Sequence, residues 1–283
     1  MKKSHVILAI LSFHPFDTFE HTSLLVSRLR LIATRTTATV QHYAMSSGKI
    51  TLYQFMPMPN DVPQVSSSPF CVKLEAYLIL TGRPYVTAAG SPPFAPTKTL
   101  PYVGYRGEKV GDSQAIIDRL EAESLVSHTS LGEGALSVEQ QRTSQEVLEL
   151  VETKLYFSLV YSRFAMDEGW EHQIEEVKFG LPWILRCCLP GRIRVEQIEK
   201  CATHGCVSDD TAFKDVEVWL QRLAEILGDK QFIFEEEPHV ADCSLYGFLV
   251  IAQGAHHENP LTTAVTKNDR LMHFVARMHD EPS

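Results

Sequence analysis

Residues 49–82 contain a strand pattern followed by a helix with well-marked ends. Residues 49–55 alternate polar and apolar side chains among strong β-formers, which predicts a strand. After a proline-rich loop, Ser68 and Pro69 open an apolar helical repeat, because serine is a favoured cap and proline a favoured first residue. The helix is expected to stop at Gly82, since glycine is the usual residue at a helix end.

The next forty residues continue this alternation. Residues 84–87 form a second candidate strand, and a proline-led strand begins after Leu100 and Pro101. A glycine turn leads to a fourth strand, and Asp112 opens another helix with an apolar face. The order β-α-β, loop, β-β-α predicts an α/β domain.

The helix start at residues 68–71, Ser-Pro-Phe-Cys, carries specific chemistry. A helix N-terminus presents unpaired backbone N–H groups and the positive end of the helix dipole. A thiolate is stabilised at such a site. The alternative interpretation is a plain helix cap.

Three motifs in this order resemble the thioredoxin-like half of a glutathione transferase. They are the Ser-Pro-Phe-Cys start, Leu100-Pro101-Tyr102 and Gly111-Asp112-Ser113. Their fuller strings are similar to one branch, which holds the failed-axon-connections, cadmium-responsive and metaxin-like proteins. The resemblance covers about residues 49–280. It implies an N-terminal thioredoxin-like βαβ-ββα domain followed by an all-helical C-terminal domain, which is an α/β plus all-α fold.

The resemblance also implies a glutathione site. Pro101 takes the place of the family's cis-proline, so the backbone of Leu100 would bind the cysteinyl part of glutathione. Asp112 would meet the ammonium of the γ-glutamyl end, and the N–H of Ser113 would hold its carboxylate. A simple helix cap is the alternative interpretation of Asp112 and Ser113.

Ser68 is the predicted catalytic residue, because its hydroxyl would stabilise the glutathione thiolate by hydrogen bonding. Ser67 is the reserve, since it would occupy the cap if the turn shifted by one residue. Cys71 lies one turn into the helix and is expected to be a packed thiol, although a mixed disulfide with glutathione is the alternative. Glutathione-dependent disulfide exchange would need a cysteine in place of Ser68.

The second half of the chain has helical periodicity. Ser137 and Gln140 resemble a capping box, and an apolar stripe at helical spacing follows. Further helices are expected at residues 174–186, with a kink or break at Pro182, and at 195–201, 211–227 and 243–256. The last is almost wholly apolar and so the core of its domain. Asp242, three residues after His239, predicts an N-terminal box that stabilises this helix. Aromatic residues at 156–164 either shape an acceptor pocket or pack in the core.

Composition limits the classes of function. The chain has 283 residues, 44% hydrophobic, with no apolar run long enough to span a membrane. A net charge of −9 argues against broad binding of nucleic acid or anionic membranes. Six cysteines in a chain of this length do not form a disulfide framework, so a reducing compartment fits best. The spacing of Cys201, His204 and Cys206 fits no standard zinc module, and we expect no metal site.

The first segment differs from the rest. Residues 1–45 contain five basic and two acidic residues, which gives this segment a net charge of +3. We therefore expect a poorly ordered leader or extension at 1–48, a thioredoxin-like glutathione-binding domain at 49–123, a linker at 124–136 and an all-helical domain at 137–283. The expected localisation is cytoplasmic, or mitochondrial if residues 1–45 act as a transit peptide.

Taken with the resemblance, these features predict a detoxifying glutathione transferase that conjugates the glutathione thiolate to small electrophiles. Glutathione would be its co-substrate, and a homodimer is one possible assembly. The alternative is a non-enzymatic, metaxin-like scaffold in mitochondrial or membrane-associated protein assembly.

Overall fold

The computed structural model of the protein describes residues 49–58, 65–123, 131, 136–181, 183–235 and 237–280. The predicted extension at 1–48 and most of the predicted linker lie outside these residues, so both remain predictions. No helix among the described residues is long and apolar enough to cross a lipid bilayer.

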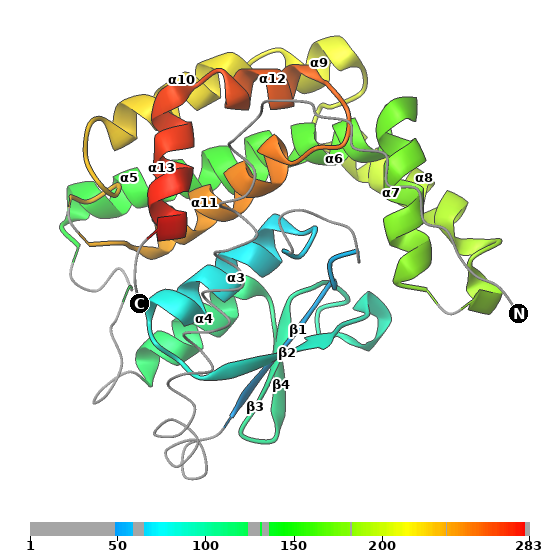
Figure 1. The fold of residues 1–283 in the computed structure, drawn as a ribbon, viewed down its shortest axis with the longest axis horizontal. Helices are drawn as coiled ribbons and strands as arrows, with labels where there is room; N and C mark the ends of the chain where they lie inside the picture. Colours follow the sequence, from blue (N-terminus) through cyan, green and yellow to red (C-terminus); the bar gives the residue numbers. More distant parts are fainter. Residues whose placement is uncertain are drawn as a thin grey trace, which may run out of the picture.

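A four-stranded sheet with the strand order β2-β1-β3-β4 forms one side of the molecule (Figure 1). β1 pairs in parallel with β2 and antiparallel with β3, which pairs antiparallel with β4. The parallel pair requires a crossover connection, and α3 provides it. This confirms the predicted β-α-β, β-β-α order. The elements are β1 (Ile50–Gln54), α3 (Pro69–Leu80), β2 (Tyr85–Ala89), β3 (Tyr102–Tyr105), β4 (Glu108–Gly111) and α4 (Ser113–Ala122).

The helix α3 begins and ends where the sequence predicts. Ser68 is its cap and Pro69 its first residue, and the chain turns away at Gly82, whose φ of +63° suits glycine. Figure 1 shows α3 lying between the sheet and the helical half of the chain. Leu52 of β1 and Leu74 of α3 are fully buried in the shared core. The first turn of α3 is therefore held at the junction of the two halves.

The second half is helical, as predicted, and Ser137 and Gln140 form the expected capping box. The elements are α5 (Val138–Glu149), the π-helical η3 (Leu150–Leu155), α6 (Tyr156–Phe164), α7 (Asp167–Phe179), the 3-10 turn η4 (Trp183–Leu185), α8 (Leu189–Thr203), α9 (Asp209–Phe213), α10 (Val216–Leu227), α11 (Val240–Gln253), α12 (Pro260–Thr266) and α13 (Asp269–Asp280).

The π-helical segment η3 was not foreseen. The buried side chains Val147, Val151, Leu155 and Leu159 repeat at intervals of four residues. This interval exceeds the 3.6 residues of an α-helical turn, so a strict α-helix would rotate the stripe away from the core. The wider π turn keeps these four side chains on one buried face, and π segments are frequent at functional sites.

Two expected helices are interrupted. The stretch expected at 174–186, with a kink or break at Pro182, ends as a helix at Phe179, and a separate 3-10 turn follows. The helix expected at 211–227 is divided into α9 and α10, with a break at Lys214 and Asp215. Apolar periodicity continues across this second break, which is why the sequence pattern did not reveal it.

The helix α11 is buried along almost its whole length and packs along α3. Asp242 accepts hydrogen bonds from the N–H groups of His239 and Ile233, both at 2.9 Å. This confirms the predicted N-terminal box and its structural role. α11 is therefore the rigid support on which the first turns of α3 rest.

Gly247 marks the closest approach of α11 to α3. A Cβ atom at this position would lie 2.6 Å from the carbonyl oxygen of Pro69 and 2.9 Å from the amide nitrogen of Lys73. Both are backbone atoms, so α3 would have to move.

We expect Gly247→Ala to lower the free energy of unfolding by about 1–3 kcal/mol, measured by denaturant titration. Gly191→Ala in α8 meets no atom within 4 Å and should be neutral or slightly stabilising. Equal effects of the two substitutions would contradict this account.

Candidate functional site

The hydroxyl of Ser68 is not used to cap its own helix. The backbone of Ser68 caps α3, because its carbonyl accepts from the N–H groups of Cys71 and Val72 at 3.1 Å. Its half-buried side chain makes no capping hydrogen bond. A donor hydroxyl thus stands at the positive end of α3, beside the thiol of Cys71, with which it interacts. This is the arrangement that would stabilise a sulfur anion brought to this position.

Cys71 is a packed thiol. It is fully buried in a small cluster with Tyr53, Leu100 and Tyr102. Burial raises the pKa of the Cys71 thiol to about 11, although the hydroxyls of Ser66 and Ser68 act in the opposite direction. A thiol with a raised pKa and no exposure is a poor nucleophile. Ser68 and Leu100 are thus both neighbours of Cys71.

The bond between Leu100 and Pro101 is cis, and both residues are buried. The bond stands immediately before β3, the central antiparallel strand of the sheet. Thr97, in the preceding loop, packs against Gly111. A Cβ atom at position 111 would lie only 2.6 Å from the Thr97 Oγ1. The loop before the cis bond therefore lies beside the end of β4, where Asp112 follows.

Asp112 caps α4 and adopts an unusual backbone conformation. Its Oδ1 accepts from the N–H groups of Gln114 and Ala115, both at 3.0 Å. Its Oδ2 has no hydrogen-bond partner within the described chain, and the residue is exposed. A φ of +73° is costly for a residue other than glycine, and such strain gathers at functional sites. The carboxylate can cap the helix with one oxygen and accept from an ammonium with the other.

A buried polar network connects α3 to both halves of the chain. The ammonium of Lys73, only 1% exposed, lies 2.6 Å from Glu152 Oε1 and 2.9 Å from Gln114 Oε1. The hydroxyl of Ser244 donates to the same Glu152 oxygen at 2.6 Å. Gln114 belongs to the first turn of α4, so this lysine holds the starts of α3 and α4 next to each other. The second turn of α3 and the first turn of α4 are thereby joined.

The helical half also contacts the loop before α3. Arg163 of α6 donates from Nη1 to the carbonyl oxygen of Ser67 at 2.7 Å. The ring of Tyr156 meets the ring of Phe70 edge-on, with centroids 5.0 Å apart. Phe157 instead stacks on His204 in the helical half. Among the aromatic residues of this stretch, Tyr156 is thus the one that reaches α3.

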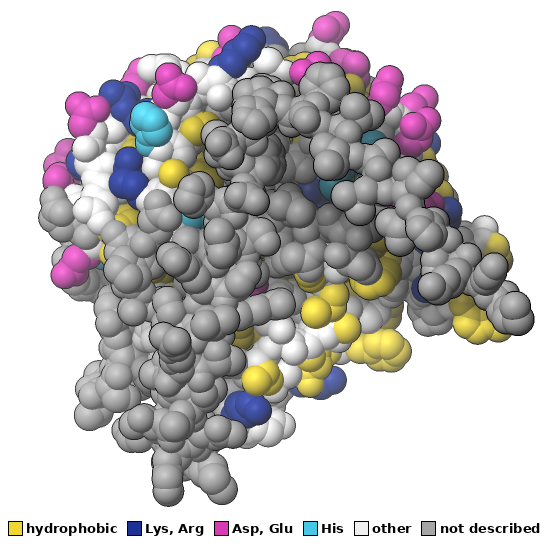
Figure 2. Space-filling model, in the orientation of Figure 1, with side chains coloured by type: hydrophobic (Ala, Val, Ile, Leu, Met, Phe, Trp, Pro, Cys, Tyr) yellow, Lys and Arg dark blue, Asp and Glu magenta, His cyan; other side chains and the backbone are white. Residues whose placement is uncertain are grey.

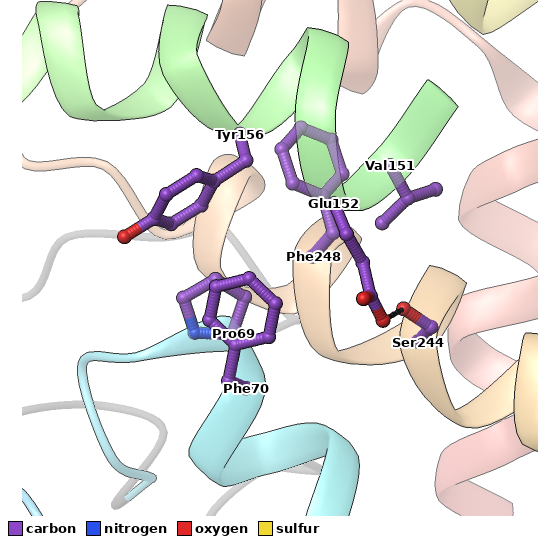
Figure 3. Close-up of a pocket in the computed structure, with 7 residues that line it drawn as sticks. All are labelled: Pro69, Phe70, Val151, Glu152, Tyr156, Ser244 and Phe248. Carbon is purple, nitrogen blue, oxygen red and sulfur yellow. Dashed lines mark hydrogen bonds between the residues drawn. The ribbon is translucent and has the colours of Figure 1, made fainter. Parts of the chain in front are cut away.

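Figure 3 shows a small cavity where these elements meet. Its volume is about 10 Å³, room for no more than one water molecule. Glu152 and Ser244 point toward each other at one side of it and are hydrogen-bonded, whereas the hydroxyl of Tyr156 points away. The two halves are closely packed here, so this cavity has no room for a substrate. The lining residues are Pro69, Phe70, Val151, Glu152, Tyr156, Ser244 and Phe248.

The structure places the six predicted site residues in two groups. Ser67, Ser68, Leu100 and Pro101 lie around the start of α3, and Asp112 and Ser113 lie at the start of α4. Their roles toward glutathione remain predictions. Among the residues described, no three His, Cys, Asp or Glu side chains gather in a way that could hold a metal ion.

Sequence reasoning missed Lys73, Glu152 and Arg163. Lys73 lies four residues after Pro69 and four before Tyr77, on one buried helical face, and this spacing could have marked it as buried. Its partner Glu152 is 79 residues away, and Arg163 is 96 residues from Ser67. No local pattern predicts such pairs.

Comparison with known proteins gives a consistent picture. A model of the glutathione S-transferase N-terminal domain matches residues 69–170, and a model of the C-terminal domain matches residues 216–278. Failed axon connections of Drosophila melanogaster is 28% identical over 255 residues, covering 82% of this chain and 57% of that protein. The chain thus spans little more than half the length of that relative.

Two further relatives are covered over most of their length. The isoprene-epoxide glutathione S-transferase of a Rhodococcus species is 29% identical over 212 residues, covering 71% of this chain and 85% of that protein. Metaxin-2 of Homo sapiens is 24% identical over 227 residues, covering 78% of this chain and 80% of that protein.

Solved structures agree on the fold. A glutathione S-transferase of Ceriporiopsis subvermispora, in complex with glutathione, has a TM-score of 0.55 and 17% identity, covering 82% of this chain and 99% of that chain. The β-etherase LigF of a Sphingobium species has a TM-score of 0.53 and 18% identity, covering 82% of this chain and 96% of that chain. The sheet with its crossover helix, the helical second half and both matching domain models lead to one conclusion. The chain belongs to the glutathione S-transferase superfamily, in the branch that includes Failed axon connections and Metaxin-2.

Proposed function

We propose that this protein binds glutathione and transfers it to small electrophiles. The observation that carries the proposal is the Ser68 hydroxyl, which stands at the N-terminus of α3 and takes no part in capping that helix. The cis bond at Pro101 supports it, as does the Oδ2 of Asp112, which has no hydrogen-bond partner among the described residues. Together they offer a hydroxyl donor for sulfur, a backbone for the cysteinyl unit and an anion for the ammonium.

Each of these residues has a defined task in the proposed reaction. Glutathione supplies the nucleophilic thiolate, whose proton passes to solvent. Ser68 donates to the sulfur, and the dipole of α3 adds to the stabilisation of its charge. Asp112 and the N–H of Ser113 fix the γ-glutamyl end, which orients the sulfur toward the electrophile.

The side of the site formed by Phe70, Tyr156 and Arg163 would hold the electrophile. The Rhodococcus relative acts, by its name, on isoprene epoxide, and we propose small epoxides among the substrates here. In that reaction a carbon–sulfur bond forms, a carbon–oxygen bond of the ring breaks, and the oxygen takes a proton from solvent.

Direct detection of the product tests this function. We expect mass spectrometry to show a glutathione adduct when the full chain is incubated with glutathione and a small epoxide or aryl halide. The rate should exceed that of the same mixture without protein. Adducts at the uncatalysed rate with every electrophile tried would contradict the proposal.

A scaffold role in membrane-associated or mitochondrial protein assembly is the second candidate. Similarity to Failed axon connections and Metaxin-2 favours it. A scaffold needs the junction of α3 with α11 but not the Ser68 hydroxyl. A well-folded chain that flows through a glutathione resin would favour this second candidate.

Arg163 provides a prediction specific to the transferase function. Arg163→Ala removes the hydrogen bond that holds the Ser67 carbonyl, so the loop before α3 loses a fixed position. We expect kcat/KM to fall about tenfold, since small misplacements of a site are costly. Arg163→Lys keeps a donor and should restore part of the rate. Identical kinetics of Arg163→Ala and the parent would show that this contact has no positioning role.

A further inference from the structure

The connection between α7 and α8 exposes an unusual set of apolar side chains. Trp183 is 80% exposed, Ile184 62%, Phe179 45% and Leu185 39%. Trp183, Ile184 and Leu185 form one short 3-10 turn, and Phe179 is the last residue of α7. Figure 1 shows α7 and α8 projecting from the body as an arm, and Figure 2 shows hydrophobic side chains at its end. We call Phe179, Trp183, Ile184, Leu185, Arg186 and Arg192 the α7–α8 tip.

The charge of this segment is opposite to that of the chain. Residues 178–195 contain four basic residues and no acidic residue, whereas the chain carries −9. Lys178 and Arg194 are paired with Glu175 and Asp167 at 2.8 Å. The exposed Arg186 and Arg192 have no carboxylate partner among the described residues. The tip therefore combines exposed apolar side chains with uncompensated positive charge.

We propose that the α7–α8 tip docks the protein on membrane surfaces that contain anionic lipid. Tryptophan and aliphatic side chains are stabilised at the level of lipid headgroups, and basic residues beside them are attracted to anionic headgroups. The chain as a whole carries −9, which opposes contact of its acidic surface with anionic lipid.

A lipid surface fits the tip better than a protein does. A stable protein interface needs about 800 Å² per partner with close shape complementarity. The tip offers three apolar side chains on one projecting turn and Phe179 at the end of α7, which is small for such an interface. Insertion of a few side chains between headgroups needs no complementary surface. Cys187 and Cys188, exposed beside Arg186, would lie at the same level.

Vesicle co-sedimentation of the full chain tests the proposal. We expect retention on vesicles of phosphatidylcholine mixed with phosphatidylserine, weaker retention on phosphatidylcholine alone, and a decline with added salt. The double variant Trp183→Asp, Ile184→Asp should bind at least about tenfold more weakly. Arg186→Glu, Arg192→Glu should lose the preference for phosphatidylserine. The control Val207→Asp, Val218→Asp changes two side chains that are 66% and 65% exposed outside the tip, and should bind like the parent.

The native cysteines provide a second readout. Cys187 and Cys188 are exposed, whereas the other four cysteines are buried, so an environment-sensitive thiol dye will label the tip. Its emission should shift to shorter wavelength on vesicles that contain phosphatidylserine. Equal binding to both vesicle types, or unchanged binding of the Trp183, Ile184 variant, would overturn the proposal. The second result would also be obtained if residues 1–48 alone bound lipid. A dimer in gel filtration that the same variant abolishes, without vesicle binding by the parent, would assign the tip to a second copy and overturn it too.

Discussion

Ser68→Ala is expected to lower kcat/KM for glutathione conjugation by about 10²-fold, the usual effect of removing one donor aimed at a developing charge. The Ser68 hydroxyl is the donor in question, and it makes no capping bond that the substitution would remove. The fold should therefore be intact, and most of the affinity for glutathione should remain because Leu100, Asp112 and Ser113 are untouched. The effect should appear in turnover rather than in binding.

The pH profile separates this role from a structural one. The hydroxyl stabilises the thiolate, so its loss should raise the pKa of bound glutathione. The rate deficit of the variant should then shrink as pH rises and both proteins reach the thiolate form. Ser67→Ala is the matched control, because Ser67 contacts Arg163 through its backbone carbonyl, which the substitution keeps. Turnover of Ser68→Ala equal to that of the parent at every pH would remove Ser68 from the mechanism.

Glu152→Ala should have the largest effect on stability. It removes the anion 2.6 Å from the ammonium of Lys73, which is 1% exposed and would lose its carboxylate partner. Breaking such a pair costs about 3–5 kcal/mol, and we expect the lower end because Glu152 is 24% exposed and Gln114 stays within reach. Chemical denaturation of the parent and the variant gives the difference.

Two controls make this prediction specific. Lys154→Ala breaks the exposed pair with Glu149 in the same helical region and should cost less than about 1 kcal/mol. Adding Lys73→Met to Glu152→Ala removes the stranded charge and should recover part of the loss. A double variant as unstable as Glu152→Ala alone would show that the buried ammonium is not the cause.

The N-terminal half of the fold could be predicted from local patterns. The cap at Ser68, the proline at position 69 and the glycine at 82 fix the bounds of α3, and each acts within a few residues. The capping box at Ser137 and the box at Asp242 were predicted for the same reason. Local sequence signals thus predict where helices begin, and the candidate site lies at the beginnings of α3 and α4.

The remaining features depend on contacts between distant residues. The bond from Arg163 to Ser67 and the ion pair of Lys73 with Glu152 join elements that no local pattern connects. The π-helical turn before α6 arises because the stripe at Val151 and Leu155 must face α11 and the core, which a single-helix pattern does not reveal. Tertiary packing, not propensity, determines these features.

The most direct test of the account is isothermal titration of glutathione into the full chain. The Ser68 hydroxyl, the cis bond at Pro101 and the Asp112 carboxylate together predict saturable binding at one site per chain. Asp112→Asn should weaken this binding, because the oxygen offered to the ammonium loses its charge. Absence of binding by the folded parent would contradict the account and would mean that the fold serves another purpose here.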